Sequence, residues 1–435
     1  MGRWKTLIMN TFLLTGASLV MRCIAMAYQV WLAGQIGAAG IGLFQLVMSV
    51  NVLCVTLAIS GIRFTATRLI SEEMGSGGGG VRKAMRSCVG YALFFGFASF
   101  IVLFLLAERI GFLWIGDART VLSLKIIAFS LPFVSLSSVM NGYFLASGKV
   151  YKTAISQVFE QLLNIALVAL FLPNAAGNLE ESCKIISFGC TLADAGGLFL
   201  LLIMYFTERH GNSGAGSKGI FGRMLRIAFP LALSAYARTS LTTLQNLLVP
   251  KELKRSGLSA DEALAGYGII NGMVYPIISF PSCILSALAE LMIPDLTKAQ
   301  VSGDTNYIKR TVSRLYKATL IFSLTVSAFI FIAADALGMM IYGTNDLGSY
   351  LRLFSLILPV MYMDIVTDGC LKGLGEMMYS MKINITEALM GVLLVIAILP
   401  RWALSGYIAI IFACEIFNFI FSILRLRKYT KSKLL

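Results

Sequence analysis

Long apolar stretches alternate with short polar ones along the whole chain. A membrane-spanning helix needs roughly 20 mostly apolar residues, and such stretches occur in two sets of six. The first set lies at about 6–33, 43–62, 85–107, 121–147, 153–172 and 184–206. The second set lies at about 223–250, 266–293, 311–335, 349–371, 380–400 and 402–424. This pattern predicts an all-α polytopic membrane protein with about twelve transmembrane helices.

Composition supports a lipid-facing surface. Of the 435 residues, 57% are apolar and 13% are charged, whereas a soluble domain carries roughly a quarter charged residues. So few charges could not coat a soluble protein of this length, but lipid accepts apolar side chains on the outside.

Basic residues concentrate on one side of the predicted helices. The formal net charge of +14 would suggest nucleic acid in a soluble protein. Here most Lys and Arg residues lie on the side of the N-terminus, for example Arg82, Lys83 and Arg86 before the third helix. By the positive-inside rule this side is cytoplasmic. We therefore expect both termini in the cytoplasm and no nucleic-acid partner.

Residues of the types that catalyse reactions or bind metals are scarce. The eight cysteines form no CxxC pair, and the single histidine, His210, lies in a polar loop. These observations argue against a histidine-based metal site or catalytic triad. No ATPase motif is visible either. The chain is therefore predicted to be no enzyme, with no catalytic residue and no bound metal.

The second half of the chain repeats the first. Positions separated by 227 residues match in Gly116 and Gly343, Pro132 and Pro359, Gly142 and Gly369, Gly148 and Gly375, and Glu160 and Glu387. With a shift of 216, Arg22 matches Arg238 and Gln29 matches Gln245. A polar stretch at 211–219 separates the halves. We expect an N-terminal lobe at 1–212 and a C-terminal lobe at 213–435, each of six helices and related as parallel repeats.

Two arginines fall near the middle of predicted helices. A charge there costs roughly 2.5–3.5 kcal/mol on insertion scales, so Arg22 and Arg238 predict a cationic cavity for an anionic group. The guanidinium fork suits phosphate, because it donates two parallel hydrogen bonds. The alternative is an internal salt bridge to an embedded Glu. Arg63 could line the mouth of the cavity or extend to the lipid headgroups.

Polar side chains form a stripe on the fifth predicted helix. Gln157, Glu160 and Asn164 are spaced by three and four residues, so they share one helical face. They could contact a sugar, take part in proton coupling, pair with the arginines, or make a structural hydrogen bond between helices. Further candidates for the cavity are Gln245, Asn271, Glu290 and Glu387.

Several motifs resemble a known family. Residues 34–45 (GQIGAAGIGLFQ) and 57–72 (LAISGIRFTATRLISE) lie near the start, and 141–148 (NGYFLASG) precedes Gln157 and Glu160. The second half contributes 229–234 (FPLALS) and 249–253 (VPKEL). Together they resemble stage V sporulation protein B and its relatives, in the polysaccharide-transport branch of the multidrug/oligosaccharidyl-lipid/polysaccharide (MOP) flippase superfamily.

The resemblance implies two six-helix bundles facing a central cavity. It implies a multi-pass protein of the bacterial cytoplasmic membrane that flips an undecaprenyl-pyrophosphate-linked oligosaccharide or peptidoglycan precursor by alternating access. Membrane lipids and cell-wall synthesis proteins are the expected partners. No cofactor is expected beyond a Na⁺ or H⁺ gradient or the membrane potential. Related lipid II flippases use cavity arginines, which implies a ligand role for Arg22 and Arg238.

The chain departs from the family pattern at two points. Many members have fourteen helices, whereas twelve are predicted here, and a Pro is common where Arg63 stands. Two other functions are compatible with the same segments: a multidrug/cation antiporter of the same superfamily, and a non-transporting membrane scaffold for cell-wall or sporulation assembly. The paired mid-helix arginines favour the flippase.

Overall fold

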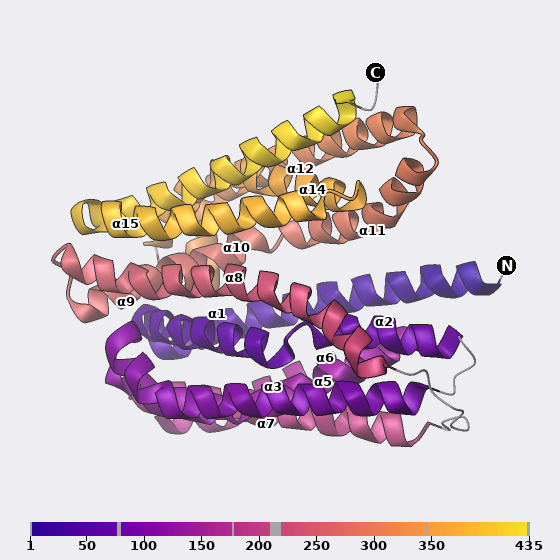
Figure 1. Cartoon of the computed structure of the whole chain (residues 1–435). Helices are drawn as coiled ribbons and strands as arrows, with labels where there is room; N and C mark the ends of the chain where they lie inside the picture. The colour runs from indigo at the N-terminus through magenta and orange to yellow at the C-terminus, as the bar shows by residue number, and fades with distance from the viewer. Residues whose placement is uncertain (1, 76–79, 176–177, 209–218, 345, 433–435) are drawn as a thin grey trace. The chain divides into compact units, whose positions relative to one another are not determined.

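The computed structural model describes residues 2–75, 80–175, 178–208, 219–344 and 346–432 (Figure 1). These residues are helical almost throughout and contain no β-strand. The helices of the first half are α1 (Gly2–Ile59), α2 (Ile62–Gly75), α3 (Val81–Arg109), η1 (Ile110–Ile115), η2 (Ala118–Thr120), α4 (Val121–Ala128), α5 (Ser130–Ala146), α6 (Val150–Phe171), η3 (Leu172–Ala175) and α7 (Leu179–Phe206). Those of the second half are α8 (Ile220–Arg255), α9 (Ala260–Gly268), η4 (Ile269–Val274), α10 (Tyr275–Ser279), α11 (Ser282–Val301), α12 (Thr305–Tyr342), α13 (Leu347–Ser355), α14 (Leu358–Gly373) and α15 (Met377–Ser432).

The described helices are long and apolar enough to cross a membrane many times. Counting each bent pair of helices as one span, ten such segments are present. Two of them, Val20–Met74 and Met377–Lys428, have 55 and 52 residues, more than twice the length that one span needs. Val20–Met74 contains a kink at Gly37 and a break at Ser60 and Gly61, and Met377–Lys428 contains a kink at Ala403. Dividing each of these two segments at its kink, Gly37 or Ala403, gives twelve candidate spans by length and composition among the described residues, which agrees with the predicted number.

Prolines follow the bends inside the spans. The α4–α5 and α13–α14 pairs are bent by 41° and 53°, and Pro132 and Pro359 lie in the first turn after each bend. A third bend of 62° separates the Ala260–Ser279 segment from α11 at Pro281. Proline has no N–H to donate to the preceding turn, so a helix is weakest just before it.

The 227-residue repeat is confirmed by backbone conformation. Gly116 and Gly343 end helices with φ of 73° and 69°, and Gly148 and Gly375 have φ of 73° and 75°. A side chain at either member of the third pair would collide with a neighbouring helix: a Cβ on Gly142 would lie 2.9 Å from the Arg63 carbonyl oxygen, and one on Gly369 would lie 2.7 Å from the Ala289 Cβ. Equivalent positions therefore perform equivalent tasks in the two halves.

The chain folds as two compact units that do not follow its halves strictly. The first unit comprises the residues up to Met21 and Leu46–Thr243, and the second comprises Arg22–Gln45 and Leu244–Leu435. The middle of α1 thus belongs to the second unit, and the first two thirds of α8 belong to the first. The predicted lobe boundary at residues 212 and 213 lies outside the described residues and stays a prediction.

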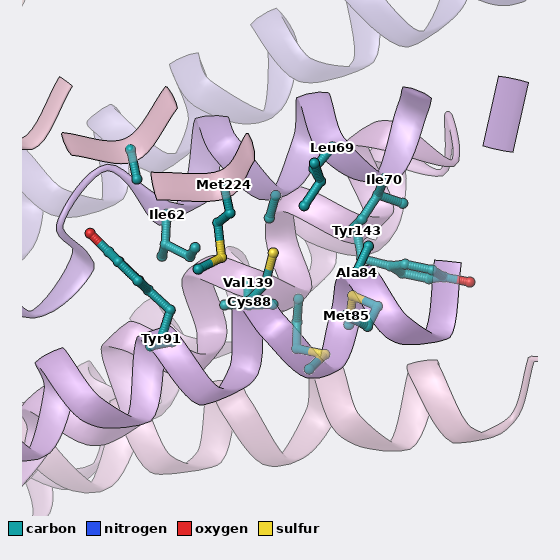
Figure 2. Close-up of a cluster of buried hydrophobic side chains, with 14 of the residues drawn as sticks. Ile62, Leu69, Ile70, Ala84, Met85, Cys88, Tyr91, Val139, Tyr143 and Met224 are labelled. Carbon is teal, nitrogen blue, oxygen red and sulfur yellow. The ribbon is translucent and has the colours of Figure 1, made fainter. Parts of the chain in front are cut away.

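A cluster of buried apolar side chains holds the first unit together (Figure 2). Its members come from α2, α3, α5, α7 and α8 and include Ile62, Leu69, Cys88, Val139 and Met224. Tyr91 lies at its edge and donates a hydrogen bond of 3.1 Å to the Ser60 carbonyl. This cluster fixes the helices that position the polar groups of the first unit.

Candidate functional site

A cavity in the second unit contains the first of the predicted arginines. It has a volume of about 290 Å³, and its lining consists of Arg22, Ala25, Met26, Gln29, Gln45, Asn271, Tyr275, Pro276, Ser279 and Phe280. We call it the Arg22 cavity. Arg22 lies about four helical turns before the Gly37 kink, and its side chain is exposed to the cavity. Two predicted site residues, Arg22 and Asn271, thus come together from distant parts of the sequence.

Glycines allow the helices around the Arg22 cavity to approach each other closely. A Cβ on Gly42 would lie 2.1 Å from the Leu264 carbonyl oxygen, and a Cβ on Gly268 would lie 2.1 Å from the Ala38 carbonyl oxygen. Gly272, one turn further, packs directly against Ile41. Small residues at such crossings let two backbones touch, and here they bring α1 against α9 and η4.

A π-helical turn shapes the wall opposite Arg22. The η4 turn, Ile269–Val274, contains Asn271 and Gly272, and such turns are frequent at functional sites. The Gln29 Nε2 donates to the Gly272 carbonyl at 3.1 Å. The Asn271 Nδ2 donates to the Tyr407 hydroxyl at 2.8 Å. Gln29 and Asn271 are therefore held by protein groups, while Arg22 has no hydrogen-bond or ion-pair partner among the residues that the structure describes.

The salt-bridge alternative for the arginines finds no support in the described residues. Within that part of the chain, neither Arg22 nor Arg238 makes an ion pair. Besides Arg22, the cavity is lined by amides, the hydroxyls of Tyr275 and Ser279, and apolar groups, with no carboxylate among the residues described there. A positive charge surrounded in this way can accept an anionic ligand.

A cavity in the first unit has the opposite character. It has a volume of about 370 Å³, and its lining consists of Asn51, Val52, Val55, Thr56, Val134, Ser137, Ser138, Asn141, Gln157, Glu160 and Asp194. We call it the carboxyl cavity. Glu160 of α6 and Asp194 of α7 thus bring two carboxyl groups into one cavity. Two ionised carboxylates that lie close together repel each other.

The predicted polar stripe of α6 is only partly in the carboxyl cavity. Gln157 and Glu160 line it, where α6 packs closely on α7 because Gly197 leaves room for the Glu160 side chain. The Ser156 hydroxyl donates to the Gly197 carbonyl at 3.1 Å and ties the same crossing. Asn164, one turn further along α6, lies against Gly189 of α7.

A second group of acids lies in α14 and α15 of the second unit. Glu387 accepts a hydrogen bond from the Asn418 Nδ2, and Asn418 also donates to Asn384 Oδ1 at 3.0 Å. Glu415 accepts from the Tyr275 hydroxyl at 3.4 Å, which links this group to a residue of the Arg22 cavity. Within the described residues, no three His, Cys, Asp or Glu side chains form a group that could hold a metal ion.

Arg63 and Arg238 lie in the first unit, next to a break in the second spanning helix. Ser60 and Gly61 separate α1 from α2 with φ of 48° and 71°, and Arg63 is in the first turn of α2. The Ser60 hydroxyl hydrogen-bonds to Tyr236 of α8, two residues before Arg238. Both arginines are exposed. Because Arg22 belongs to the other unit, a cationic face shared by Arg22 and Arg238 stays a prediction.

Two further predicted residues have different positions. Gln245 of α8 packs on α15, where a Cβ on Gly391 would lie 2.6 Å from its Oε1. The Glu290 side chain lies outside the described residues. The roles of all the predicted site residues stay predictions, although the geometry now groups them.

Sequence reasoning missed part of both cavities. Gln29, Gln45 and Tyr275 line the Arg22 cavity, and Asn51 and Asn141 line the carboxyl cavity. These polar residues are less costly in a membrane than charges, so they gave a weaker signal. Glu415 was also missed, although an embedded carboxylate in the twelfth helix met the criterion used for Glu387.

Comparison with known families is consistent with these features. A family model described as polysaccharide biosynthesis protein matches residues 7–300, and a model described as MatE matches residues 252–397. Stage V sporulation protein B of Bacillus subtilis (strain 168) is 23% identical over 415 residues, which cover 92% of this chain and 80% of that protein. Lipid II flippase MurJ of the same organism is 22% identical over 370 residues, which cover 78% of this chain and 67% of that protein.

Solved structures show the same fold. The inward-facing conformation of a multidrug resistance MATE family transporter of the MOP superfamily aligns with a TM-score of 0.77 and 16% identity, over 95% of each chain. The MATE multidrug transporter DinF-BH aligns with a TM-score of 0.73 and 17% identity, over 99% of this chain and 97% of that one. The predicted all-α, MATE/MOP-like membrane fold is thereby confirmed, as is the resemblance to the polysaccharide-transport branch.

Proposed function

The chain belongs to the polysaccharide biosynthesis protein family, and we propose that it is a membrane flippase for a lipid-linked oligosaccharide or peptidoglycan precursor. The proposed substrate carries an undecaprenyl pyrophosphate, and the proposed cycle is alternating access across the cytoplasmic membrane. The proposed partners are the membrane lipids that surround the protein and the cell-wall synthesis proteins that supply or consume the substrate. The similarity to a lipid II flippase and the match to the polysaccharide biosynthesis family model support this class of substrate.

The observation that carries the proposal is Arg22 in its cavity. Placing a guanidinium within a membrane-spanning helix costs free energy, so an arginine at such a position indicates a functional role. Arg22 makes no ion pair among the described residues, so its donors remain available to a pyrophosphate. Two parallel N–H···O bonds from one guanidinium fit two oxygens of such a group.

The amides around Arg22 suit the polar remainder of the substrate. Gln29, Gln45 and Asn271 line the same cavity, and amides both donate to and accept from sugar hydroxyls. Asn271 is already fixed by Tyr407, so its remaining acceptor is presented in one orientation. The prenyl tail is too long and too apolar for a cavity of about 290 Å³, and we place it in the lipid.

The carboxyl cavity supports a role in ion coupling. Glu160 and Asp194 line the same cavity, and one proton on the pair relieves the repulsion between the two carboxyl groups. A second charge on this pair would be unfavourable, because two like charges would lie side by side. We propose that uptake and release of this proton couples the cycle to a proton gradient.

The test is lipid flipping by the purified protein in vesicles. Fluorescently labelled lipid II is the probe, and its loss of accessibility to an external quencher is measured over time. We expect wild-type protein to accelerate flipping, Arg22→Ala to abolish most of the acceleration, and Arg22→Lys to retain part of it. The retained charge in Arg22→Lys attracts phosphate, but a single ammonium lacks the bidentate fork.

A matched control uses another basic residue of the same chain. Lys83 is exposed near the start of α3 and belongs to neither cavity, so Lys83→Ala should flip lipid II at the wild-type rate. Full activity of a folded Arg22→Ala protein would refute the role of Arg22. Export of cationic dyes by wild-type vesicles that flip no lipid II would favour the antiporter instead.

A further inference from the structure

A third cavity lies along α3 in the first unit, away from the residues discussed so far. It has a volume of about 670 Å³ and is larger than either of the other two. Its lining consists of Arg82, Met85, Arg86, Val89, Gly90, Leu93, Leu136, Met140, Leu202, Tyr205 and Phe206. We call it the α3 groove. All of these residues belong to α3, α5 and α7 of the first unit.

Polar groups are confined to one end of the α3 groove. Arg82 and Arg86 lie in the first turns of α3, and Tyr205 lies in the last turn of α7. The remaining lining residues are apolar or glycine. The spacing of four residues places both arginines on the same face of α3. The groove is therefore basic at the end where α3 begins and α7 ends, and it is apolar further along α3.

The length of the groove corresponds to one leaflet of a bilayer. From Arg82 to Leu93, α3 advances about 16 Å at 1.5 Å per residue. The hydrocarbon core of a bilayer is about 30 Å thick, so the groove extends through roughly half of it. A molecule filling the groove would place its charged end at the membrane surface and its apolar part within one leaflet.

The charges at the mouth are complementary to a phosphate. Arg86 makes no ion pair or hydrogen bond among the described residues. Arg82 interacts electrostatically with the Tyr205 hydroxyl, which is neutral and can itself donate to a phosphate oxygen. Glu208, which also interacts electrostatically with Tyr205, forms ion pairs with Lys152 at 2.6 Å and Lys149 at 2.9 Å. Basic pockets at the ends of spanning helices bind anionic lipid headgroups.

We propose that the α3 groove binds an anionic glycerophospholipid. The headgroup phosphate lies between Arg82 and Arg86, with Tyr205 as a further donor, and one acyl chain follows α3 past Gly90 and Leu93. The site is separate from the Arg22 cavity and the carboxyl cavity. It does not depend on which substrate the protein transports.

Gly90 offers a way to fill the groove without disturbing the protein. A Cβ at Gly90 meets no atom within 4 Å, so the side chain of Gly90→Leu would project into the space of the acyl chain. Leucine also favours a helix over glycine by close to 1 kcal/mol, and α3 should form at least as well. Gly222 in α8 is the matched control, because its Cβ would also meet nothing and it does not line the groove.

The experiment is native mass spectrometry of the full chain in detergent with added lipid. Phosphatidylglycerol is the probe, and phosphatidylcholine with the same acyl chains is the comparison, because its zwitterionic headgroup carries no net charge. We expect wild-type protein to retain one phosphatidylglycerol in preference to phosphatidylcholine. Arg86→Ala should reduce this retention about fivefold, the effect of one basic side chain at a membrane surface.

The variants separate a specific site from general adhesion of lipid. Gly90→Leu should lose bound phosphatidylglycerol although every charge is kept, whereas Lys83→Ala and Gly222→Leu should retain it as wild type does. Equal retention of the two lipids by wild-type protein would overturn the proposal. So would a loss in Lys83→Ala as large as that in Arg86→Ala, since adhesion would then follow net charge alone.

Discussion

The Arg22 cavity and the carboxyl cavity are similar in size and opposite in charge. The first, of about 290 Å³, contains one guanidinium among amides, and the second, of about 370 Å³, contains two carboxyl groups. Both are built where glycines let two helices approach closely, at Gly42 and Gly268 in one case and at Gly197 in the other. The difference teaches that close helix crossings provide both cavities, while the few charged side chains decide what each can bind.

An added side chain would meet different kinds of atoms at these glycines. The largest expected effect on stability is therefore at Gly268. A Cβ on Gly268 would meet the Ala38 backbone at 2.1 Å, whereas a Cβ on Gly197 would meet the end of the Glu160 side chain at 2.7 Å. Backbone cannot move aside, so Gly268→Leu should cost about 3 kcal/mol or more and close the Arg22 cavity. The melting temperature and the yield of monodisperse protein are the measurements.

Two controls accompany this variant. Gly34→Leu lies in α1, the helix that crosses α9 at Gly268. Its added Cβ would meet no atom within 4 Å, so this variant should leave stability unchanged. Gly197→Ala should melt close to wild type, because the flexible Glu160 side chain can give way. If Gly268→Leu is as stable as Gly34→Leu, the close crossing of α1 with α9 is wrong.

The carboxyl pair predicts an intermediate effect on transport. Glu160→Gln keeps the shape of the side chain but removes the exchangeable carboxyl proton. The response of transport to a pH gradient should therefore be largely lost. Substrate binding in the Arg22 cavity should stay the same. Flipping in vesicles with and without an imposed pH gradient measures both; a gradient response equal to wild type would contradict the coupling role.

The smallest effect on stability is expected at Glu208 of the first unit, which lies outside the spanning segments and pairs with Lys149 and Lys152. Burial by itself raises the pKa of Glu208, but hydrogen bonds from Lys152 and Lys149 outweigh it and hold the pKa below its ordinary value of 4.5. The stabilisation from Glu208 is therefore present above pH 4.5 and is lost as the pH falls through the lower, folded-state pKa. Glu208→Gln should cost about 1 kcal/mol at neutral pH.

The pH dependence of this variant provides its own control. The stability difference between wild type and Glu208→Gln should shrink on acidification below pH 4.5, as Glu208 becomes protonated. Thermal melts of both proteins across this range measure it. A difference that is constant with pH would show that the Glu208 charge does not contribute.

Much of the fold followed from the sequence because its signals are local. Runs of apolar residues gave the spans, and the 227-residue register predicted equivalent turns at Gly116 and Gly343 and equivalent bends before Pro132 and Pro359. A left-handed glycine or a proline acts on its own few residues. Such positions can therefore be recognised without knowing what packs against them.

The cavities could be predicted only in part. The cost of burying charge in a membrane identified Arg22 and Glu160, but not that Asn271 would lie beside one and Asp194 beside the other. The division of α1 between the two units was not foreseen either. It depends on which helices pack together over hundreds of residues, for example Gly42 on Leu264, and no local pattern records such a contact.

The most direct test of the central claim is the affinity of the Arg22 cavity for a lipid pyrophosphate. Purified wild type, Arg22→Ala and Glu160→Gln are titrated with undecaprenyl pyrophosphate in detergent, and binding is followed by calorimetry. Loss of a charged hydrogen-bonding group costs roughly 1.5–3 kcal/mol, so Arg22→Ala should bind about 10- to 100-fold more weakly. Glu160→Gln should bind as wild type does. Equal affinity of Arg22→Ala and wild type, with both proteins folded, would contradict the assignment of the pyrophosphate to this cavity.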